Sequence, residues 1–167
     1  MKQIKSSGSL ISSIKMLLLC SILLVAAESY VRAVDNKQPA AKTKAGNTGI
    51  AFIENNWNAA LQQAKASKKL IFVDAYATWC GPCKLLKSTT FKDTTAAAFF
   101  NSHFINLSLD VEKGKGPELA TQWKIQGLPT LLVLDANKKV VAQSVGYLGA
   151  GNLLEWAKQV LAQNNLP

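Results

Sequence analysis

Hydrophobic residues in the C-terminal two thirds of the chain change between two spacings. A stripe at helical spacing over residues 53–64 is followed by a continuous apolar run at 70–76, which is typical of a buried strand. The same patterns predict further helices at 81–91, 94–100, 117–123 and 153–161, and further strands at 104–109, 130–134 and 140–145. Residues 135–139 have the composition of a hairpin turn. This order predicts an α/β fold with a mixed central sheet and helices on both faces.

The first 33 residues have the pattern of an export signal. Three lysines precede an apolar run at residues 16–27, and small-residue cleavage patterns end at Ala27 and Ala33. Twelve residues are short for a membrane span, which needs roughly 20. The sequence therefore predicts a signal peptide over residues 1–33, cleavage after Ala33 or Ala27, and a periplasmic location.

The remaining chain divides into a short linker and one domain. Residues 34–48 are polar and poor in large apolar side chains, which predicts a flexible linker. Residues 49–167 are enough for a single domain with its own core. The formal net charge of +9 falls by 3 without residues 1–33, and the domain itself carries about +4 on scattered lysines. This pattern favours a solvated basic surface and not a nucleic-acid partner.

The segment Trp79-Cys80-Gly81-Pro82-Cys83 lies where the strand at 70–76 should give way to a helix. A cysteine in the first helical turn faces unpaired N–H groups and the positive end of the helix dipole, which favour its thiolate. The second cysteine lies one turn further on the same side. Pro82 is compatible with the first turn, where its missing N–H would be unpaired in any case. The spacing predicts a reversible, redox-active disulfide between Cys80 and Cys83.

Other interpretations of the two cysteines need residues that the domain does not offer. A zinc site takes about four ligands, whereas the domain adds only His103 and no third cysteine. Covalent haem attachment requires a histidine directly after the second cysteine, and Lys84 is there instead. A purely structural disulfide would close a loop of two residues and remove little unfolded-state entropy. We therefore expect no metal and no cofactor beyond the dithiol itself.

Three features in this order resemble the thioredoxin family. They are the Trp-Cys-Gly-Pro-Cys-Lys motif at 79–84, Asp74 six residues before Cys80, and Gly127-Leu128-Pro129-Thr130 before a hairpin. The resemblance covers residues 52–164 and implies a thioredoxin fold with a cis bond before Pro129. The segment 88–93 and the Gly-Leu-Pro-Thr sequence are most similar to exported thioredoxin-like domains, such as the C-terminal periplasmic domain of DsbD.

The resemblance also assigns roles to individual residues. It implies that Cys80 is the nucleophile, that Cys83 resolves the mixed disulfide, and that Asp74 takes the proton of Cys83. It implies a substrate groove lined by Trp79, Gly81, Pro82, Leu128, Pro129, Gly146 and Tyr147. Three positions depart from the family pattern, and one is Ser88, which stands where thioredoxin has a proline that kinks this helix. Asn106 stands where thioredoxin has a lysine near its buried aspartate, and Lys87 stands where the DsbD domain has an acidic residue.

The expected function is reduction of disulfides in exported proteins. A Gly-Pro pair between the cysteines resembles the reducing members of the family, and an oxidising compartment would require a membrane electron donor such as a DsbD-like conductor. We expect a monomer. Two alternatives stay open: a periplasmic oxidant with the same dithiol, and a non-catalytic module that binds peptides through the same fold.

Overall fold

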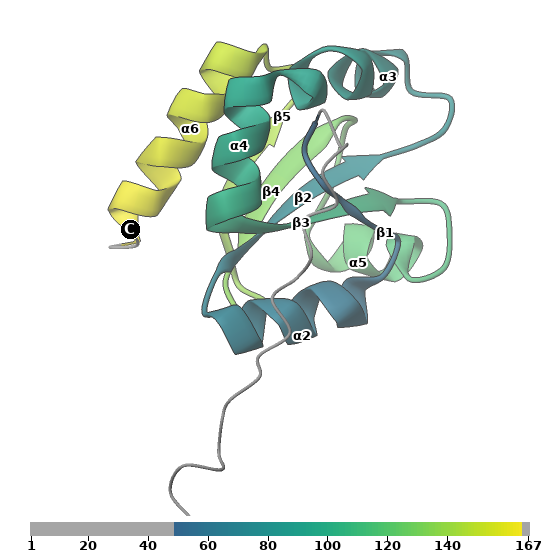
Figure 1. Ribbon diagram of the computed structural model, residues 1–167. Helices are drawn as coiled ribbons and strands as arrows, with labels where there is room; N and C mark the ends of the chain where they lie inside the picture. The colour runs from purple at the N-terminus through teal and green to yellow at the C-terminus, as the bar shows by residue number, and fades with distance from the viewer. Residues whose placement is uncertain (1–48, 165–167) are drawn as a thin grey trace, which may run out of the picture. The chain divides into compact units, whose positions relative to one another are not determined.

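The computed structural model describes residues 49–164 (Figure 1). The predicted signal peptide at 1–33 and linker at 34–48 lie outside this range and stay predictions. The described part is an alternation of short helices and strands. In chain order these are β1 (Ile53–Glu54), α2 (Trp57–Ser67), β2 (Leu70–Tyr76), α3 (Gly81–Ser88), the 3₁₀ turn η1 (Thr90–Lys92), α4 (Thr94–His103), β3 (Phe104–Asp110), α5 (Gly116–Gln122), β4 (Thr130–Leu134), β5 (Val140–Val145) and α6 (Ala150–Gln163).

The five strands form one mixed sheet in the order β1-β3-β2-β4-β5. The first three run parallel to one another, β4 pairs antiparallel with β2, and β5 pairs antiparallel with β4. Helices cover both faces, with α3, α4 and α6 on one side and α2 and α5 on the other (Figure 1). This is the thioredoxin fold, so the predicted fold class is confirmed.

Alternating side chains of the central strand β2 enter two separate hydrophobic cores. Phe72 lies in the core beneath α3, α4 and α6 and contacts a cluster of aromatic rings, with its centroid 4.5 Å from that of Phe100. Ile71 and Val73 lie in the core beneath α2 and α5. Because both faces of β2 are covered, the strand is apolar throughout except at Asp74.

Two local predictions are wrong. The hydrophobic spacing puts Ile53 in the first helical stripe, but it lies in β1, and α2 begins only at Trp57. The helix begins there because the Asn56 side chain accepts a hydrogen bond from the Ala59 N–H and caps the first turn. The spacing also puts Phe91 on the active-site helix, but α3 ends at Ser88 and Phe91 lies in η1.

Candidate active site

The two cysteines lie at the N-terminus of α3, directly after the central strand. Cys80 is the N-cap residue, and its Sγ accepts a hydrogen bond from the Cys83 N–H at 3.2 Å. The structure joins the two residues in a disulfide with a Cα–Cα distance of 5.3 Å. Both side chains are buried, whereas Gly81 and Pro82 between them are exposed. A helix N-terminus stabilises negative charge, so this position favours the Cys80 thiolate when the disulfide opens.

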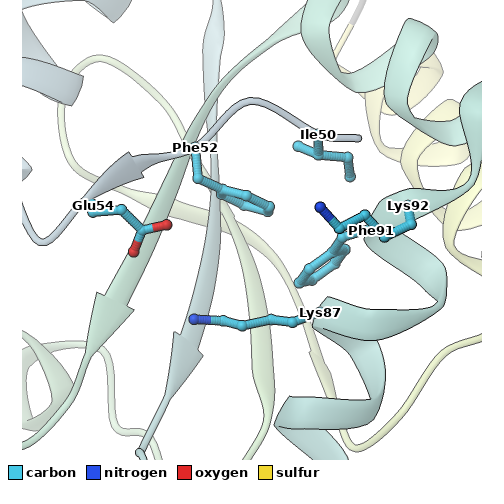
Figure 2. A pocket seen from close by; sticks show the side chains of 6 residues that line it. All are labelled: Ile50, Phe52, Glu54, Lys87, Phe91 and Lys92. Atoms are coloured by element: carbon cyan, nitrogen blue, oxygen red, sulfur yellow. The ribbon is translucent and has the colours of Figure 1, made fainter. Parts of the chain in front are cut away.

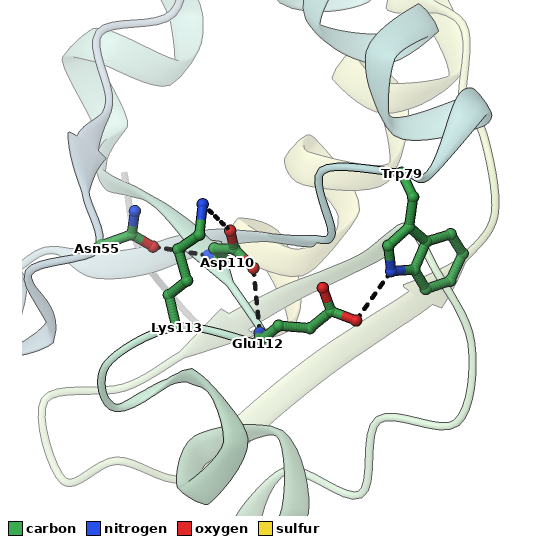
Figure 3. A network of polar contacts seen from close by, with 5 residues as sticks. All are labelled: Asn55, Trp79, Asp110, Glu112 and Lys113. Carbon is green, nitrogen blue, oxygen red and sulfur yellow. Dashed lines mark hydrogen bonds and ion pairs between the residues drawn. The ribbon is translucent and has the colours of Figure 1, made fainter.

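Trp79 marks the exposed side of the disulfide. Its side chain is 67% exposed, and its indole N–H donates a 2.8 Å hydrogen bond to Glu112 Oε1 (Figure 3). Glu112 is held in turn through its backbone N–H, which donates to Asp110 Oδ1 at 3.0 Å. Lys113 pairs with the other oxygen of Asp110 at 3.0 Å. The loop after β3 therefore fixes Trp79 by its polar edge and leaves its apolar face open beside Cys80.

The predicted groove residues of the second half of the chain lie directly before β4 and directly after β5. Leu128 packs against the cluster that contains Cys80 and Cys83. The Leu128–Pro129 peptide bond is cis, and the Pro129 carbonyl accepts a 2.8 Å hydrogen bond from the Gly146 N–H. Tyr147 is half exposed, and its hydroxyl lies 3.4 Å from that of Thr90 beyond the end of α3. The structure thus brings Leu128 to the cysteines and places Gly146 against Pro129.

Asp74 lies on the face of β2 that is covered by α3, two residues after Phe72 of the core on that side. Its carboxyl group is fully buried, and Oδ2 accepts a 3.3 Å hydrogen bond from the Ser108 hydroxyl. The other oxygen, Oδ1, has no hydrogen-bond partner among the described residues. An unpaired buried carboxylate is costly, so the site favours a neutral, protonated Asp74.

The pKa of Asp74 is raised by burial from its ordinary value of 3.8 to about 7. Two groups act in the opposite direction, the Lys87 ammonium and then the hydrogen bond from Ser108, while the negative charge of Glu54 adds to the increase. A pKa near 7 suits a group that must both accept and release a proton at neutral pH.

A pocket of about 270 Å³ opens on the same side of the sheet as Asp74 (Figure 2). Glu54 and Lys87 line it together with an apolar wall. Lys87 extends from α3 across this pocket, and its Nζ lies 3.2 Å from the centre of the Tyr76 ring. The remaining lining residues are Ile50, Phe52, Phe91 and Lys92.

Ser108, Glu54 and Glu112 were not identified from the sequence as site residues. Ser108 and Glu54 reach Asp74 through strand register, because Asp74 pairs with Ser108 and Ser108 pairs with Glu54. Glu112 is 33 residues from Trp79 in the sequence. No local pattern carries these pairings. Lys87 was recognised as a departure from the family, but its position over Tyr76 was not expected.

The described part of the chain contains neither a cluster of metal ligands nor a long apolar helix. Within residues 49–164, no three His, Cys, Asp or Glu side chains come together as a group that could hold a metal ion. Among the helices of the same range, none is both long enough and apolar enough to cross a membrane.

Comparison with known proteins gives consistent matches. The family model described as thioredoxin matches residues 49–159. Thioredoxin-1 of Drosophila melanogaster is 38% identical over 77 residues, which are 46% of this chain and 67% of that protein. A solved structure of a candidate disulphide-isomerase from Bacteroides thetaiotaomicron is 44% identical, with a TM-score of 0.61, over 68% of this chain and 93% of that one.

A further relative is the thiol:disulfide interchange protein DsbD of Tatumella citrea. It is 32% identical over 105 residues, which are 61% of this chain but only 18% of that protein. The likeness therefore concerns less than a fifth of that protein's length.

Proposed function

The chain belongs to the thioredoxin family of thiol:disulfide oxidoreductases, and from this premise we propose that it is an exported protein that reduces protein disulfides. The observation that supports this best is the arrangement of the Cys80–Cys83 disulfide. Cys80 directly follows the exposed Trp79. The buried carboxyl of Asp74, whose pKa is raised, lies on the α3-covered face of β2, the strand that precedes these residues. The first favours access of a protein substrate, and the second supplies a proton acceptor.

The proposed reaction begins with the reduced protein. The Cys80 thiolate attacks one sulfur of a substrate disulfide, forms a mixed disulfide and releases the other substrate sulfur as a thiolate. Cys83 then gives its proton to the Asp74 carboxylate, directly or through water, and attacks the Cys80 sulfur. The Cys80–Cys83 disulfide forms, and the second substrate thiolate leaves. Two electrons have passed from the protein to the substrate.

The substrate would bind over the exposed surface beside the disulfide. Trp79, Val145 and Tyr147 are large apolar side chains that face solvent there or nearby. An extended peptide can bind as an added strand, through hydrogen bonds to backbone groups of the protein. The backbone at Leu128, in the segment before β4, is the position that we propose for such pairing. Gly81 and Pro82, which directly follow Cys80 in the first turn of α3, are exposed.

Export and re-reduction complete the proposal. A signal peptide over residues 1–33 would deliver the protein to the periplasm, where disulfides of exported proteins form and persist. The oxidised protein then needs electrons from the membrane. The likeness to a part of DsbD supports a DsbD-like conductor as the donor.

The reduction potential of the Cys80–Cys83 pair tests the direction of electron flow. We would equilibrate the purified protein with glutathione and dithiothreitol buffers and count free thiols. A reduction potential of about −270 mV, as in thioredoxin, supports a reductase. A potential of about −120 mV, as in DsbA, would make the protein an oxidant.

A trapping experiment separates an enzyme from a binding module. Cys83→Ser should hold substrates as mixed disulfides with Cys80, and Cys80→Ser should trap none. Binding of the same partners that is non-covalent and indifferent to both substitutions would overturn the proposed enzyme.

A further inference from the structure

We propose that Lys87 and Glu54 are opposing positioning residues for Asp74, which set its protonation from a solvent-accessible pocket on the α3-covered face of the sheet. The inference rests on the proposed function, in which Asp74 accepts a proton, and it assigns the regulation of that step to two charged side chains that line the pocket.

The pocket and Asp74 share one face of the sheet. Side chains alternate along a strand, so Phe72, Asp74 and Tyr76 project from β2 to the same side. The two neighbours of Asp74 both contact pocket-lining residues. The Phe72 ring centroid lies 6.1 Å from that of Phe52, and the Tyr76 ring lies 3.2 Å from Lys87 Nζ. Asp74 is therefore flanked along its own strand by two residues that contact the lining of the pocket.

A second line of contacts reaches Asp74 across the strands. Glu54 on β1 pairs in register with Ser108 on β3, and Ser108 pairs with Asp74 on β2. Paired residues of adjacent parallel strands lie on the same face. A row of polar side chains thus runs from the exposed Glu54, through the buried Ser108 hydroxyl, to the buried carboxyl.

Lys87 and Glu54 act on this row with opposite sign. Lys87 extends from α3 to the ring of Tyr76, which follows Asp74 on the same face of β2. Figure 2 shows it extending across the pocket toward the side on which Glu54 lies. A positive charge near a carboxyl favours its ionised form, and a negative charge disfavours it. The other charged or titratable side chains on this face, from every element packed there, are Tyr76 on β2, Lys92 on η1 and Asp110 on β3. The partner of Asp74 on β4 is the apolar Leu131.

The charges of Lys87 and Glu54 should act on Asp74 from the pocket, because the rest of the Asp74 side chain is enclosed by the protein. The carboxyl has no solvent exposure of its own. The pocket volume of about 270 Å³ is large enough for several water molecules, each of which takes about 30 Å³ in the liquid. Water and salt can thus enter beside Lys87 and Glu54 but cannot contact Asp74 directly.

Removing either the positive charge of Lys87 or the negative charge of Glu54 tests the inference. The measured quantity is the titration midpoint of Asp74, which a purely structural role of these residues would not shift in opposite directions. The Asp74 carboxyl can be titrated by carbon NMR in the oxidised, full-length chain. We expect Lys87→Met to raise the titration midpoint and Glu54→Gln to lower it, each by about half a pH unit, which is roughly threefold in the ionisation constant. Lys87→Arg should restore the midpoint. Lys84→Met, on the exposed side of the same helix, should leave it unchanged.

Salt provides a second readout on the same variants. Exposed charges are screened strongly at 1 M salt, where the Debye length is about 3 Å. The midpoints of Lys87→Met and Glu54→Gln should therefore approach that of the unsubstituted protein as salt is raised. Midpoints that shift in the same direction in both variants, or no further than in Lys84→Met, overturn the inference.

The kinetic consequence separates this inference from the proposed function. The pH dependence of mixed-disulfide resolution should move with the Asp74 midpoint, upward in Lys87→Met and downward in Glu54→Gln. If the NMR midpoints move and the rate profile does not, the positioning role stands and the role of Asp74 as proton acceptor fails. If the midpoints stay fixed while disulfide reduction continues, the positioning role of Lys87 and Glu54 fails and the proposed disulfide reductase stands.

Discussion

The Asp74 carboxyl titrates near pH 7 in the folded protein because burial raises its pKa, whereas 3.8 is its ordinary value in an unfolded chain. Below pH 3.8 the group is protonated in both states, and its burial carries no ionisation cost. As the pH rises toward 7, the unfolded chain releases the proton and the folded protein retains it, so stability is lost across this interval. A difference of about three pH units corresponds to about 4 kcal/mol.

Asp74→Asn should remove this pH dependence while keeping the size of the side chain. Between pH 4.5 and pH 8, the unsubstituted protein should lose more free energy of unfolding than the variant, by about 3 kcal/mol, because part of the loss is already complete at pH 4.5. Urea denaturation of both oxidised proteins at the two pH values measures the difference. Glu118→Gln, an exposed carboxyl on α5, serves as the control. Equal losses in Asp74→Asn and the control protein would show that Asp74 is already ionised when folded.

At this scale the sequence points to Cys80, Cys83 and Asp74 as the candidate reacting groups but not to the residues that surround Asp74. Asp74 could be identified because its offset from Cys80 is a local pattern. Ser108 and Glu54 could not, because their approach to Asp74 depends on the register of three strands. The resemblance to thioredoxin instead places Asn106 near Asp74. In the structure Asn106 pairs with Phe72, two residues before Asp74 on β2, and Ser108 is the residue that pairs with Asp74.

Among the structural elements, the loop between β3 and α5 links the sheet to the active site. Gly116 closes this loop, and a Cβ atom there would overlap the backbone carbonyl of Asp110. The loop carries Glu112, which holds the indole of Trp79. The geometry of the open face beside Cys80 therefore depends on a glycine more than 30 residues away.

Gly116→Ala should lower the free energy of unfolding by about 1–3 kcal/mol, because the backbone must shift to relieve the overlap. Gly151→Ala is the matched control. Gly151 lies in α6, and a Cβ atom there would meet no neighbouring atom within 4 Å, so alanine should stabilise that helix by up to about 1 kcal/mol. Thermal unfolding of the two variants measures both effects. A Gly116→Ala protein as stable as the original would mean that the loop adjusts freely.

Strand and helix positions were predictable where the elements are long enough to show a period. The strands β2, β4 and β5 lie at the predicted residues, and β3 extends one residue further, to Asp110. The two-residue strand β1 is too short for any period, so Ile53 was absorbed into the neighbouring helical stripe. The spacing of apolar residues also does not reveal that α3 ends at Ser88, because Phe91, which lies in η1, continues the helical spacing.

Across the whole domain, one sheet separates two hydrophobic cores, and neighbouring residues of β4 enter opposite ones. Leu131 belongs to the core beneath α3, α4 and α6, and Leu132 to the core beneath α2 and α5. Both are fully buried. The redox site spans β2, α3 and the segment before β4, so it depends on packing on both faces.

Leu131→Ala and Leu132→Ala should therefore each lower the free energy of unfolding of the entire domain by about 2–5 kcal/mol. Trp57 and Trp123 lie in one core and Trp156 packs against the other, so tryptophan fluorescence reports on both. In each variant, the fluorescence transition in urea should coincide with loss of far-UV circular dichroism. Leu85→Ala, at an exposed position on α3, should change stability by no more than about 0.5 kcal/mol. Separate transitions in either core variant would mean that the two faces unfold independently, and that the disulfide can be exposed without global unfolding.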